Sequence, residues 1–322
     1  MENYRYLSAS NYFKIKYGKS FQRLPIDAGF FCPGRCIYCS ASGSLSPVQA
    51  SLLSNIMVKE NLYNFRYNIG ERKNLIKLQV DEYFKRNQNI LRFYENGLKR
   101  KKLLYIYFQA FTNTYDKTEN LAEIYDYALS LADFDGIFLG TRPDCLLDDV
   151  VNLLFKYSKK YDIWIELGLQ TIHDRTLNYI NRMHDKKSFQ IAVEKLQKNN
   201  IKVIAHVILG LLDETAEENI ETIKFISNLS INGVKFHNLY IMKNTEILKY
   251  YERGIQKVLS YEDYIDRLSQ CIKYLKSDIA IFRLFSDFEP GTIAPVWDIN
   301  KTLLIKKFEK NLEQLNINQG MI

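Results

Sequence analysis

Three cysteines lie close together near the start of the chain, in the run Cys-Pro-Gly-Arg-Cys-Ile-Tyr-Cys that contains Cys32, Cys36 and Cys39. Their CxxxCxxC spacing places three thiols on one tight loop, directly after a stretch with the composition of a strand. An iron–sulfur cubane is normally held by four cysteine thiolates. Three ligands without an evident fourth therefore favour a cubane in which one iron is open to another molecule.

Two other kinds of site use the same residue types. A zinc site needs a fourth Cys or His ligand nearby, and the nearest histidine in the sequence is the distant His173. Cys36 and Cys39 are also spaced like a thiol redox pair, but the segment does not resemble a thioredoxin context. A non-catalytic metal-binding or iron–sulfur protein therefore stays open as an alternative.

The elements that must position this loop can be predicted from the periodicity of the apolar residues. We expect strands at residues 26–31, 103–109, 136–140, 163–167, 203–209 and 233–240. We expect helices between them at residues 117–131, 146–159, 175–180, 187–198 and 214–229. Strand–helix units in series favour parallel strands joined by right-handed crossovers.

Six such units are fewer than the eight of a closed barrel. The predicted fold class is therefore α/β, a partial (β/α)6 TIM-like barrel over residues 1–240, with a doubly wound sheet as the alternative. Residues 51–102 are predicted to be a helical insertion after the first strand, including a helix at 73–84. Residues 241–322 are predicted to be a C-terminal extension with helices at 245–253, 261–277 and 301–315 and a short strand at 279–284. Ligands should gather at the C-terminal ends of the strands, where the cysteine loop also lies.

The composition of the chain indicates which partners and which cellular compartment can be expected. The 322 residues carry 44 Lys and Arg against 37 Asp and Glu, a net charge of +7, with a basic run at 99–102. This charge is compatible with a polyanionic partner, but an ordinary basic surface accounts for it equally well. No apolar stretch is long enough to span a bilayer, and the N-terminus lacks the apolar core of a signal peptide. We expect a cytoplasmic protein that has no membrane partner.

Several longer runs accompany the cysteine motif. They are Leu24-Pro-Ile-Asp-Ala-Gly-Phe, Tyr107-Phe-Gln-Ala-Phe-Thr-Asn-Thr-Tyr, Gly140-Thr-Arg-Pro-Asp-Cys, Trp164-Ile-Glu-Leu-Gly-Leu-Gln-Thr and Ala205-His-Val-Ile-Leu-Gly-Leu. Together they resemble the radical S-adenosylmethionine (SAM) superfamily, in its YhcC/YtqA-type branch, which is related to the radical domain of the Elongator catalytic subunit. The resemblance implies that the three cysteines bind a [4Fe–4S] cluster and that SAM chelates the fourth iron. It also implies that an electron donor of flavodoxin or ferredoxin type reduces the cluster, so that a 5′-deoxyadenosyl radical forms.

The resemblance also assigns roles to residues at the ends of the second and third strands. Members of the superfamily often carry Gly-Gly-Glu after the second strand to hold the methionine amino group, whereas this chain has Gln109-Ala-Phe-Thr-Asn113. Gln109 and Asn113 are therefore the candidates there. Thr141 and Arg142 end the third predicted strand, and Arg142 could hold a carboxylate or phosphate in a catalytic role. A structural salt bridge is the alternative for Arg142.

Later strands supply the remaining candidates. Glu166 and Gln170 lie in a run that resembles the fourth-strand cofactor motif, and a carboxylate within an apolar strand needs a partner. Glu166 is therefore predicted to bind cofactor or to act in catalysis. His206 and Gly210 resemble the fifth-strand element that packs against adenine, although a strand histidine is often only a core residue. Relatives follow this turn with Pro-Gly, whereas this chain has Leu212-Asp.

The substrate follows from the resemblance alone. It suggests transfer RNA, with the wobble uridine as the target and conversion of a carboxymethylaminomethyl side chain to the aminomethyl form as one concrete reaction. A small metabolite or a peptide is the alternative substrate for the same radical chemistry. No oligomeric state can be predicted.

Overall fold

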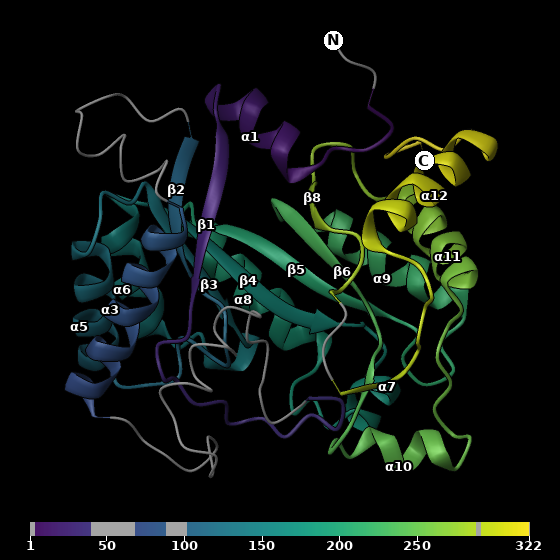
Figure 1. Ribbon diagram of the computed structural model, residues 1–322, viewed down its shortest axis with the longest axis horizontal. Helices are drawn as coiled ribbons and strands as arrows, with labels where there is room; N and C mark the ends of the chain where they lie inside the picture. The colour runs from purple at the N-terminus through teal and green to yellow at the C-terminus, as the bar shows by residue number, and fades with distance from the viewer. Residues whose placement is uncertain (1–3, 40–67, 88–101, 288–290, 322) are drawn as a thin grey trace.

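A parallel sheet organises the molecule in the computed structural model, which describes residues 4–39, 68–87, 102–287 and 291–321. Seven strands pair in the order β1-β2-β3-β4-β5-β6-β8 and curl into a half-barrel (Figure 1). Their bounds are β1 Ser20–Ile26, β2 Lys102–Phe108, β3 Gly136–Thr141, β4 Asp162–Gln170, β5 Lys202–Leu209, β6 Gly233–Asn238 and β8 Ala280–Arg283. The central strands are buried on both faces, as expected for a parallel sheet whose outer face is covered by helices.

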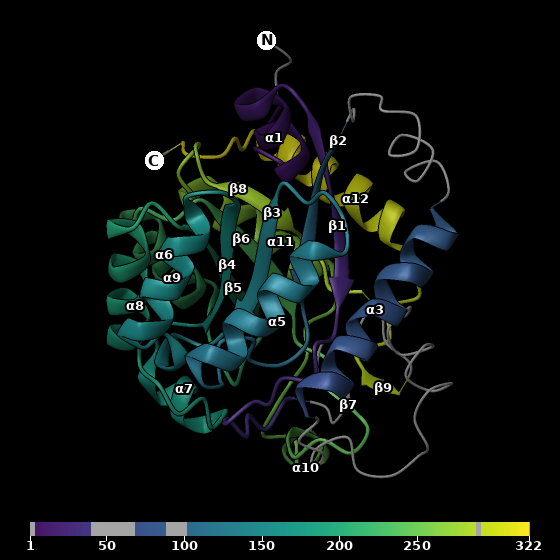
Figure 2. The same cartoon turned by 90° about the vertical axis from the view of Figure 1, so that its left-hand side faces the viewer.

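Helices connect the strands and cover the outside of the curled sheet (Figure 2). The crossover helices are α3 Ile69–Arg86, α5 Thr118–Ser130, α6 Asp148–Ser158, α7 Asp174–Tyr179, α8 Lys186–Lys198, α9 Ala216–Asn228 and α11 Tyr261–Tyr274. The remaining elements are α1 Ala9–Tyr17, η1 Pro143–Cys145, α10 Ile247–Glu252, α12 Lys301–Gln314 and a two-stranded antiparallel pair of β7 Ile241–Met242 and β9 Thr292–Ala294. Within the described ranges, no helix is long and apolar enough to cross a membrane.

The predicted partial barrel is confirmed, but it has a seventh strand. The predicted strand at 279–284 becomes β8, which pairs in parallel with β6 and so belongs to the barrel sheet. The predicted helix at 73–84 becomes α3, which packs against β1 and α5 as the first crossover of the barrel. The rest of the predicted insertion, residues 51–67 and 88–101, lies outside the described residues, and the division of the chain at residue 240 stays a prediction.

The position predicted for the first strand is wrong. The structure places β1 at Ser20–Ile26, and residues 27–31 form the loop that leads to the first cysteine. Ala28 and Phe30 are apolar because they are buried, Phe30 beneath the guanidinium of Arg72 on α3, 4.0 Å from its ring centre. Pro25 is tolerated within the strand because β1 is an edge of the sheet.

An aromatic plug closes the N-terminal end of the half-barrel. Phe13 of α1 is fully buried, with its ring centre 3.9 Å from that of Phe21 and 5.4 Å from that of Trp164. Tyr105 and Phe138 complete this cluster. The opposite end of the barrel, where the loops follow the strands, is left for ligands.

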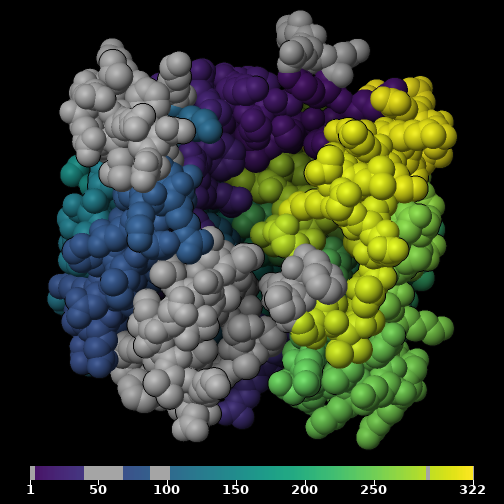
Figure 3. All heavy atoms as spheres, in the orientation of Figure 1, coloured from purple at the N-terminus to yellow at the C-terminus, as the bar shows by residue number. Residues whose placement is uncertain are grey.

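The two ends of the chain are tied to each other beside this plug. Leu7 and Arg5 hydrogen-bond through backbone and side chain to Gln319 and Ile317. The space-filling view shows the C-terminal segment lying against the N-terminal one on this face (Figure 3).

Candidate active site

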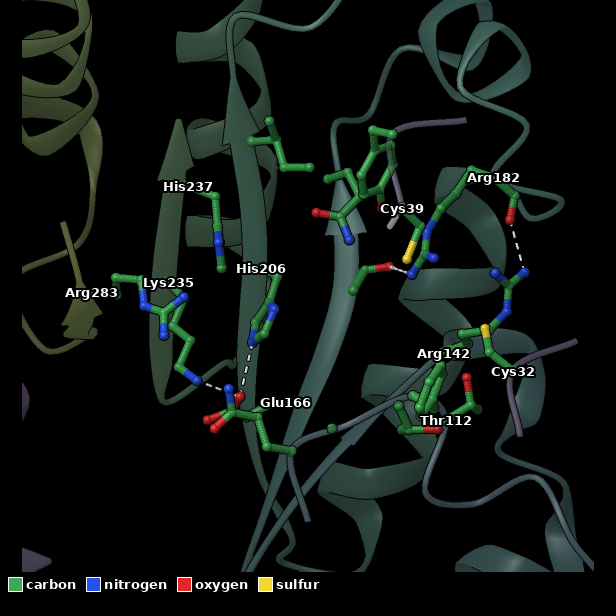
Figure 4. A pocket seen from close by; sticks show the side chains of 18 of the residues that line it. Cys32, Cys39, Thr112, Arg142, Glu166, Arg182, His206, Lys235, His237 and Arg283 are labelled. Atoms are coloured by element: carbon green, nitrogen blue, oxygen red, sulfur yellow. Dashed lines mark hydrogen bonds and ion pairs between the residues drawn. The ribbon is translucent and has the colours of Figure 1, made fainter. Parts of the chain in front are cut away.

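A cavity of about 210 Å³ lies at the C-terminal ends of the strands. Its lining comes from all seven strands or the loops that follow them: Cys32, Tyr38, Cys39, Tyr107, Gln109, Phe111, Thr112, Gly140, Thr141, Arg142, Glu166, Gly168, Gln170, Arg182, His206, Ile208, Lys235, His237 and Arg283. Figure 4 shows two ends: cysteines with Arg142 and Arg182 at one, and Glu166 with Lys235 and Arg283 at the other. We call these the cysteine end and the charged end.

Most of the predicted site residues meet on this cavity. Those that line it are Cys32, Cys39, Gln109, Thr141, Arg142, Glu166, Gln170 and His206. Cys36 is buried behind the lining, and Asn113 and Gly210 support the strand ends without reaching the cavity wall. The roles predicted for these residues toward a cofactor stay predictions.

Two arginines hold the cysteine loop from inside the barrel. Arg182 Nη1 lies 3.5 Å from the Sγ of the buried Cys36, and Arg142 Nη1 lies 4.0 Å from the same sulfur. A Cβ on Gly34 would lie only 2.2 Å from Arg142 Nη1, so the loop passes directly over this guanidinium. Two guanidiniums therefore lie next to the sulfur of Cys36.

Arg142 itself is 3% exposed and fully engaged. Its guanidinium donates to both carboxylate oxygens of Asp144, at 3.0 and 2.9 Å, and to the backbone oxygen of Arg182 at 2.8 Å. This is the salt-bridge geometry that the sequence left as an alternative. In this arrangement Arg142 fixes the loop, and its predicted contact with a substrate anion stays a prediction.

The residues of the cysteine end fit an iron–sulfur cluster. Within the described part of the chain, no group of three or more His, Cys, Asp or Glu side chains converges as a site for a single metal ion. A cubane instead carries each cysteine on a different iron, so three sulfurs spread along one loop suit it. A cluster with three thiolates is anionic, and Arg142 and Arg182 supply the compensating charge.

Arg182 is a site residue that the sequence did not reveal. It lies on the loop between α7 and α8, and its Nη2 donates to the backbone oxygen of Gly168 at 2.7 Å. A Cβ on Gly168 would lie 2.3 Å from that nitrogen, so only glycine leaves room for the guanidinium. No spacing rule links Arg182 to the cysteines, because the fold alone brings the two loops together.

The ends of β2, β3 and β4 are shaped by local hydrogen bonds and a bulge. Asn113 donates from Nδ2 to the backbone oxygens of Phe108 and Gly140, both at 2.9 Å, which joins β2 to β3. Thr141 shares a 2.5 Å hydrogen bond with the hydroxyl of Thr114. Gln170 follows a bulge and has φ 78°, a strained value for a residue with a side chain, and such strain is typical of functional sites.

The turn after β5 is held by one buried side chain. Gly210 has φ 93°, and its backbone oxygen accepts a 3.0 Å hydrogen bond from Nε2 of the buried Gln256. The Oε1 of the same glutamine accepts from the backbone nitrogen of Leu212 at 2.9 Å. One buried amide thereby joins both ends of the turn between Gly210 and Leu212.

Glu166 lies at the centre of the charged end and is 1% exposed. Its Oε1 accepts from Arg23 Nη1 at 3.0 Å, and its Oε2 pairs with Lys235 Nζ. Oε2 also accepts from the hydroxyl of Tyr107 at 2.5 Å and from His206 Nε2 at 3.1 Å. The sequence prediction that Glu166 needs a polar partner is answered chiefly by Lys235, a residue that sequence reasoning missed.

These contacts set the ionisation of the charged end. Burial alone raises the pKa of Glu166, but the charge of Lys235, the hydrogen bond from His206 and the charge of Arg23 outweigh it and hold the pKa well below its usual range. Burial lowers the pKa of His206 to about 4, against the hydrogen bond to Glu166. Burial also holds the pKa of His237 well below its usual range, together with the charge of Arg283. Glu166 is therefore ionised and both imidazoles are neutral near pH 7.

A parallel half-barrel with a cysteine loop and a charged interior on one cavity defines an α/β enzyme that handles a cofactor at its strand ends. The model of the Radical SAM superfamily matches residues 27–226, and that of the Radical_SAM C-terminal domain matches residues 231–314. The chain belongs to the radical SAM superfamily and is an enzyme. Membership implies SAM and a [4Fe–4S] cluster as cofactors.

Relatives extend over nearly the whole chain. YtqA of Bacillus subtilis (strain 168) is 32% identical over 98% of this chain and 92% of its own length. MJ0486 of Methanocaldococcus jannaschii is 33% identical over 99% of this chain and 92% of its own length. The tRNA uridine(34) acetyltransferase of the same archaeon is 24% identical over 48% of this chain and 28% of its own length. The structure of Methanocaldococcus infernus Elp3 superposes with a TM-score of 0.64 at 17% identity, covering 79% of this chain and 62% of that one, which shows a shared fold.

Proposed function

We propose that this enzyme modifies transfer RNA by radical chemistry at the side chain of the wobble uridine. A concrete reaction is the conversion of a carboxymethylaminomethyl group to an aminomethyl group, in which SAM and water would be consumed and the two-carbon fragment would leave as glyoxylate, with methionine and 5′-deoxyadenosine as the other products. The observation that carries the proposal is the continuous cavity that joins the cysteine end to the charged end. The partial similarity to a tRNA uridine(34) acetyltransferase supports the substrate class.

The chain's own residues have separable tasks in this proposal. When bound, a [4Fe–4S] cluster and SAM supply a 5′-deoxyadenosyl radical that abstracts a hydrogen atom from the substrate. Cys32, Cys36 and Cys39 would hold the cluster, which a donor of flavodoxin or ferredoxin type would reduce. Arg142 and Arg182 hold the loop and place positive charge at the Cys36 sulfur.

The cavity offers polar side chains that would orient SAM, from the strand ends beside the cysteines to the charged end. The predicted cofactor residues that line it are Gln109, Thr141, Glu166, Gln170 and His206. Asn113 and Gly210 would act through the backbone that they shape. The aromatic plug beneath keeps water from entering the barrel at its other end, which protects a reactive radical.

The test with the most information compares transfer RNA from cells with and without the gene. Digested nucleosides are separated and identified by mass spectrometry. We expect the carboxymethylaminomethyl form of the wobble uridine to accumulate when the gene is deleted. The parent gene restores the aminomethyl form and a Cys32→Ala gene does not. Identical nucleoside profiles in the two strains would contradict the proposal.

A second experiment separates transfer RNA from a metabolite or peptide substrate. Binding of purified transfer RNA should be measurable at low ionic strength and should weaken steeply as salt is added, because phosphate contacts release counterions. An absence of binding at low ionic strength would leave the radical chemistry in place and remove transfer RNA as its substrate.

A further inference from the structure

The charged end of the cavity holds more positive than negative charge. Lys235, Arg283 and the adjoining Arg23 face one carboxylate, that of Glu166. Figure 4 shows the side chains of Lys235 and Arg283 together at this end, away from the cysteines. The three cations come from three different strands, β1, β6 and β8.

Glu166 cannot neutralise all of these cations. One of its oxygens is taken by Arg23, and the other already accepts from Lys235, Tyr107 and His206. Lys235 is 1% exposed and finds its counterion in Glu166. The pair is therefore internally satisfied, and the charge of Arg283 remains.

Arg283 ends β8 beside Lys235, its register partner on β6. Among the residues that the structure describes, its nearest carboxylate is Asp287, which is 3.9 Å from Nη2 and more than half exposed. That distance is too long for a hydrogen bond, and among the residues that the structure describes Arg283 makes no other ion pair or hydrogen bond. A guanidinium that lines a cavity with its donors uncommitted is a ready site for a carboxylate.

His237 supplies a second donor at the same end. Its Nε2 is buried and, among the described residues, has no hydrogen-bond partner. Its Nδ1 lies 3.1 Å from the hydroxyl of Ser286, whose backbone nitrogen donates to Asn238 Oδ1 at 3.0 Å. When the Ser286 hydroxyl donates to Nδ1, the neutral ring carries its proton on Nε2, a buried donor on a residue that lines the cavity.

We propose that Arg283 and His237 form a subsite for the carboxylate of the substrate side chain. This inference rests on the proposed function and adds that the group entering the barrel is an anion. It places the carboxylate at the charged end, away from the cysteine end, where Arg142 is already paired with Asp144. The guanidinium of Arg283, whose side chain is 25% exposed, and the imidazole N–H of His237 then share the two oxygens of one carboxylate.

The test uses the full-length protein, reconstituted with iron and sulfide under anaerobic conditions and held with SAM but no reductant. The probes are two anticodon stem–loops that differ at one group: 5-carboxymethylaminomethyluridine as the free acid, or its methyl ester. We expect the parent to prefer the acid by about 10-fold or more, the contribution of a charge-assisted hydrogen bond. Arg283→Gln should lose this preference, and Arg283→Lys should retain part of it.

A matched control removes the same charge elsewhere. Arg86 lies on α3 with its side chain 48% exposed and pairs with Glu82 on its own helix. Arg86→Gln should keep the parent's preference for the acid. Unchanged affinity of Arg283→Gln for the ester shows that the variant is folded.

Every other result contradicts either the carboxylate subsite or the proposed function. Equal affinity of the parent for acid and ester, or an undiminished preference in Arg283→Gln, overturns the subsite and leaves the proposed function standing. Weakened binding of SAM in Arg283→Gln, with the preference intact, assigns the arginine to the cofactor's carboxylate and also overturns it. If neither stem–loop binds the parent, the transfer RNA proposal fails, and the subsite fails with it.

Discussion

Substituting a residue at the cysteine end should have a different effect from substituting one at the charged end. Cys36 contacts two guanidiniums through its sulfur, whereas Glu166 and Lys235 satisfy one another in the barrel interior. We expect the contacts of Cys36 to affect assembly of a metal centre. We expect the ion pair of Glu166 and Lys235 to affect the free energy of unfolding. Variants at these positions can therefore be read independently.

Cys36→Ala should abolish cluster assembly, because it removes one of three thiolates from the loop. We expect iron and sulfide content to fall to background after anaerobic reconstitution, together with the visible absorbance of the cluster. Cys271→Ala is the matched control, since this cysteine is fully buried in α11 away from the cavity. Equal iron content in parent and Cys36→Ala would exclude Cys36 as a ligand.

Glu166→Gln should destabilise the fold, because it leaves the buried ammonium of Lys235 without a counterion. Breaking a buried pair by removing one partner costs about 3–5 kcal/mol. The double variant Glu166→Gln/Lys235→Met should recover much of the loss. Chemical denaturation of the parent, Glu166→Gln, Lys235→Met and the double variant forms a double-mutant cycle, and simple addition of the two single effects would rule out coupling.

Stability should fall on acidification from about pH 6.5 to pH 4. Burial depresses the pKa of His206 to about 4 and lowers that of His184 to about 4. The unfolded chain therefore takes up protons on these imidazoles at a higher pH than the folded chain does, so stability rises with pH across this window. His206→Gln should flatten the profile by about 1–3 kcal/mol over the window. An unaltered profile would show that His206 is not buried in the neutral form.

Elements place these residues through close contacts that only particular side chains allow. The cysteine loop passes over Arg142 at Gly34, and β4 passes Arg182 at Gly168. At both positions the guanidinium occupies the space that a Cβ atom would need. Two glycines therefore position two arginines.

Gly34→Ala should displace Arg142 and loosen the cysteine loop, since the new Cβ would lie 2.2 Å from Nη1. We expect a lower iron content after reconstitution and faster loss of iron to a chelator. In an Arg142→Ala background the same substitution should have little further effect, because the obstructing group is gone. A full additional loss in that background would place the cause elsewhere.

Much of the element plan could be predicted from the sequence, and its failures have physical causes. Strands β2 to β6 follow from apolar runs, but Ala28 and Phe30 are apolar because they are buried in a loop, so the predicted first strand lies too late in the chain. Glu166 was found because a charge interrupts an apolar strand, and Lys235 gives the same signal two residues into β6. Arg182 gives no such signal, because its role depends on where a distant loop packs.

At the scale of the whole molecule, the half-barrel is closed at one end by aromatic rings and open at the other to the cavity. Phe13→Ala should therefore lower the free energy of unfolding by about 3–5 kcal/mol, because it empties a fully buried site between Phe21 and Trp164. Denaturant unfolding measures this loss. Leu315→Ala is a suitable control, since Leu315 is half exposed at the end of α12. A loss below about 1 kcal/mol would show that the plug is not a packed core.

The cavity wall includes segments from near both ends of the polypeptide. The cysteines follow β1, at one edge of the sheet, and Arg283 ends β8, at the other edge. During synthesis the ribosome delivers the cysteine loop early and the last wall of the cavity late. The cysteines are thus made long before β8, which supplies the last part of the cavity wall. We therefore expect a cluster to be shielded from solvent only after β8 has been translated and has folded.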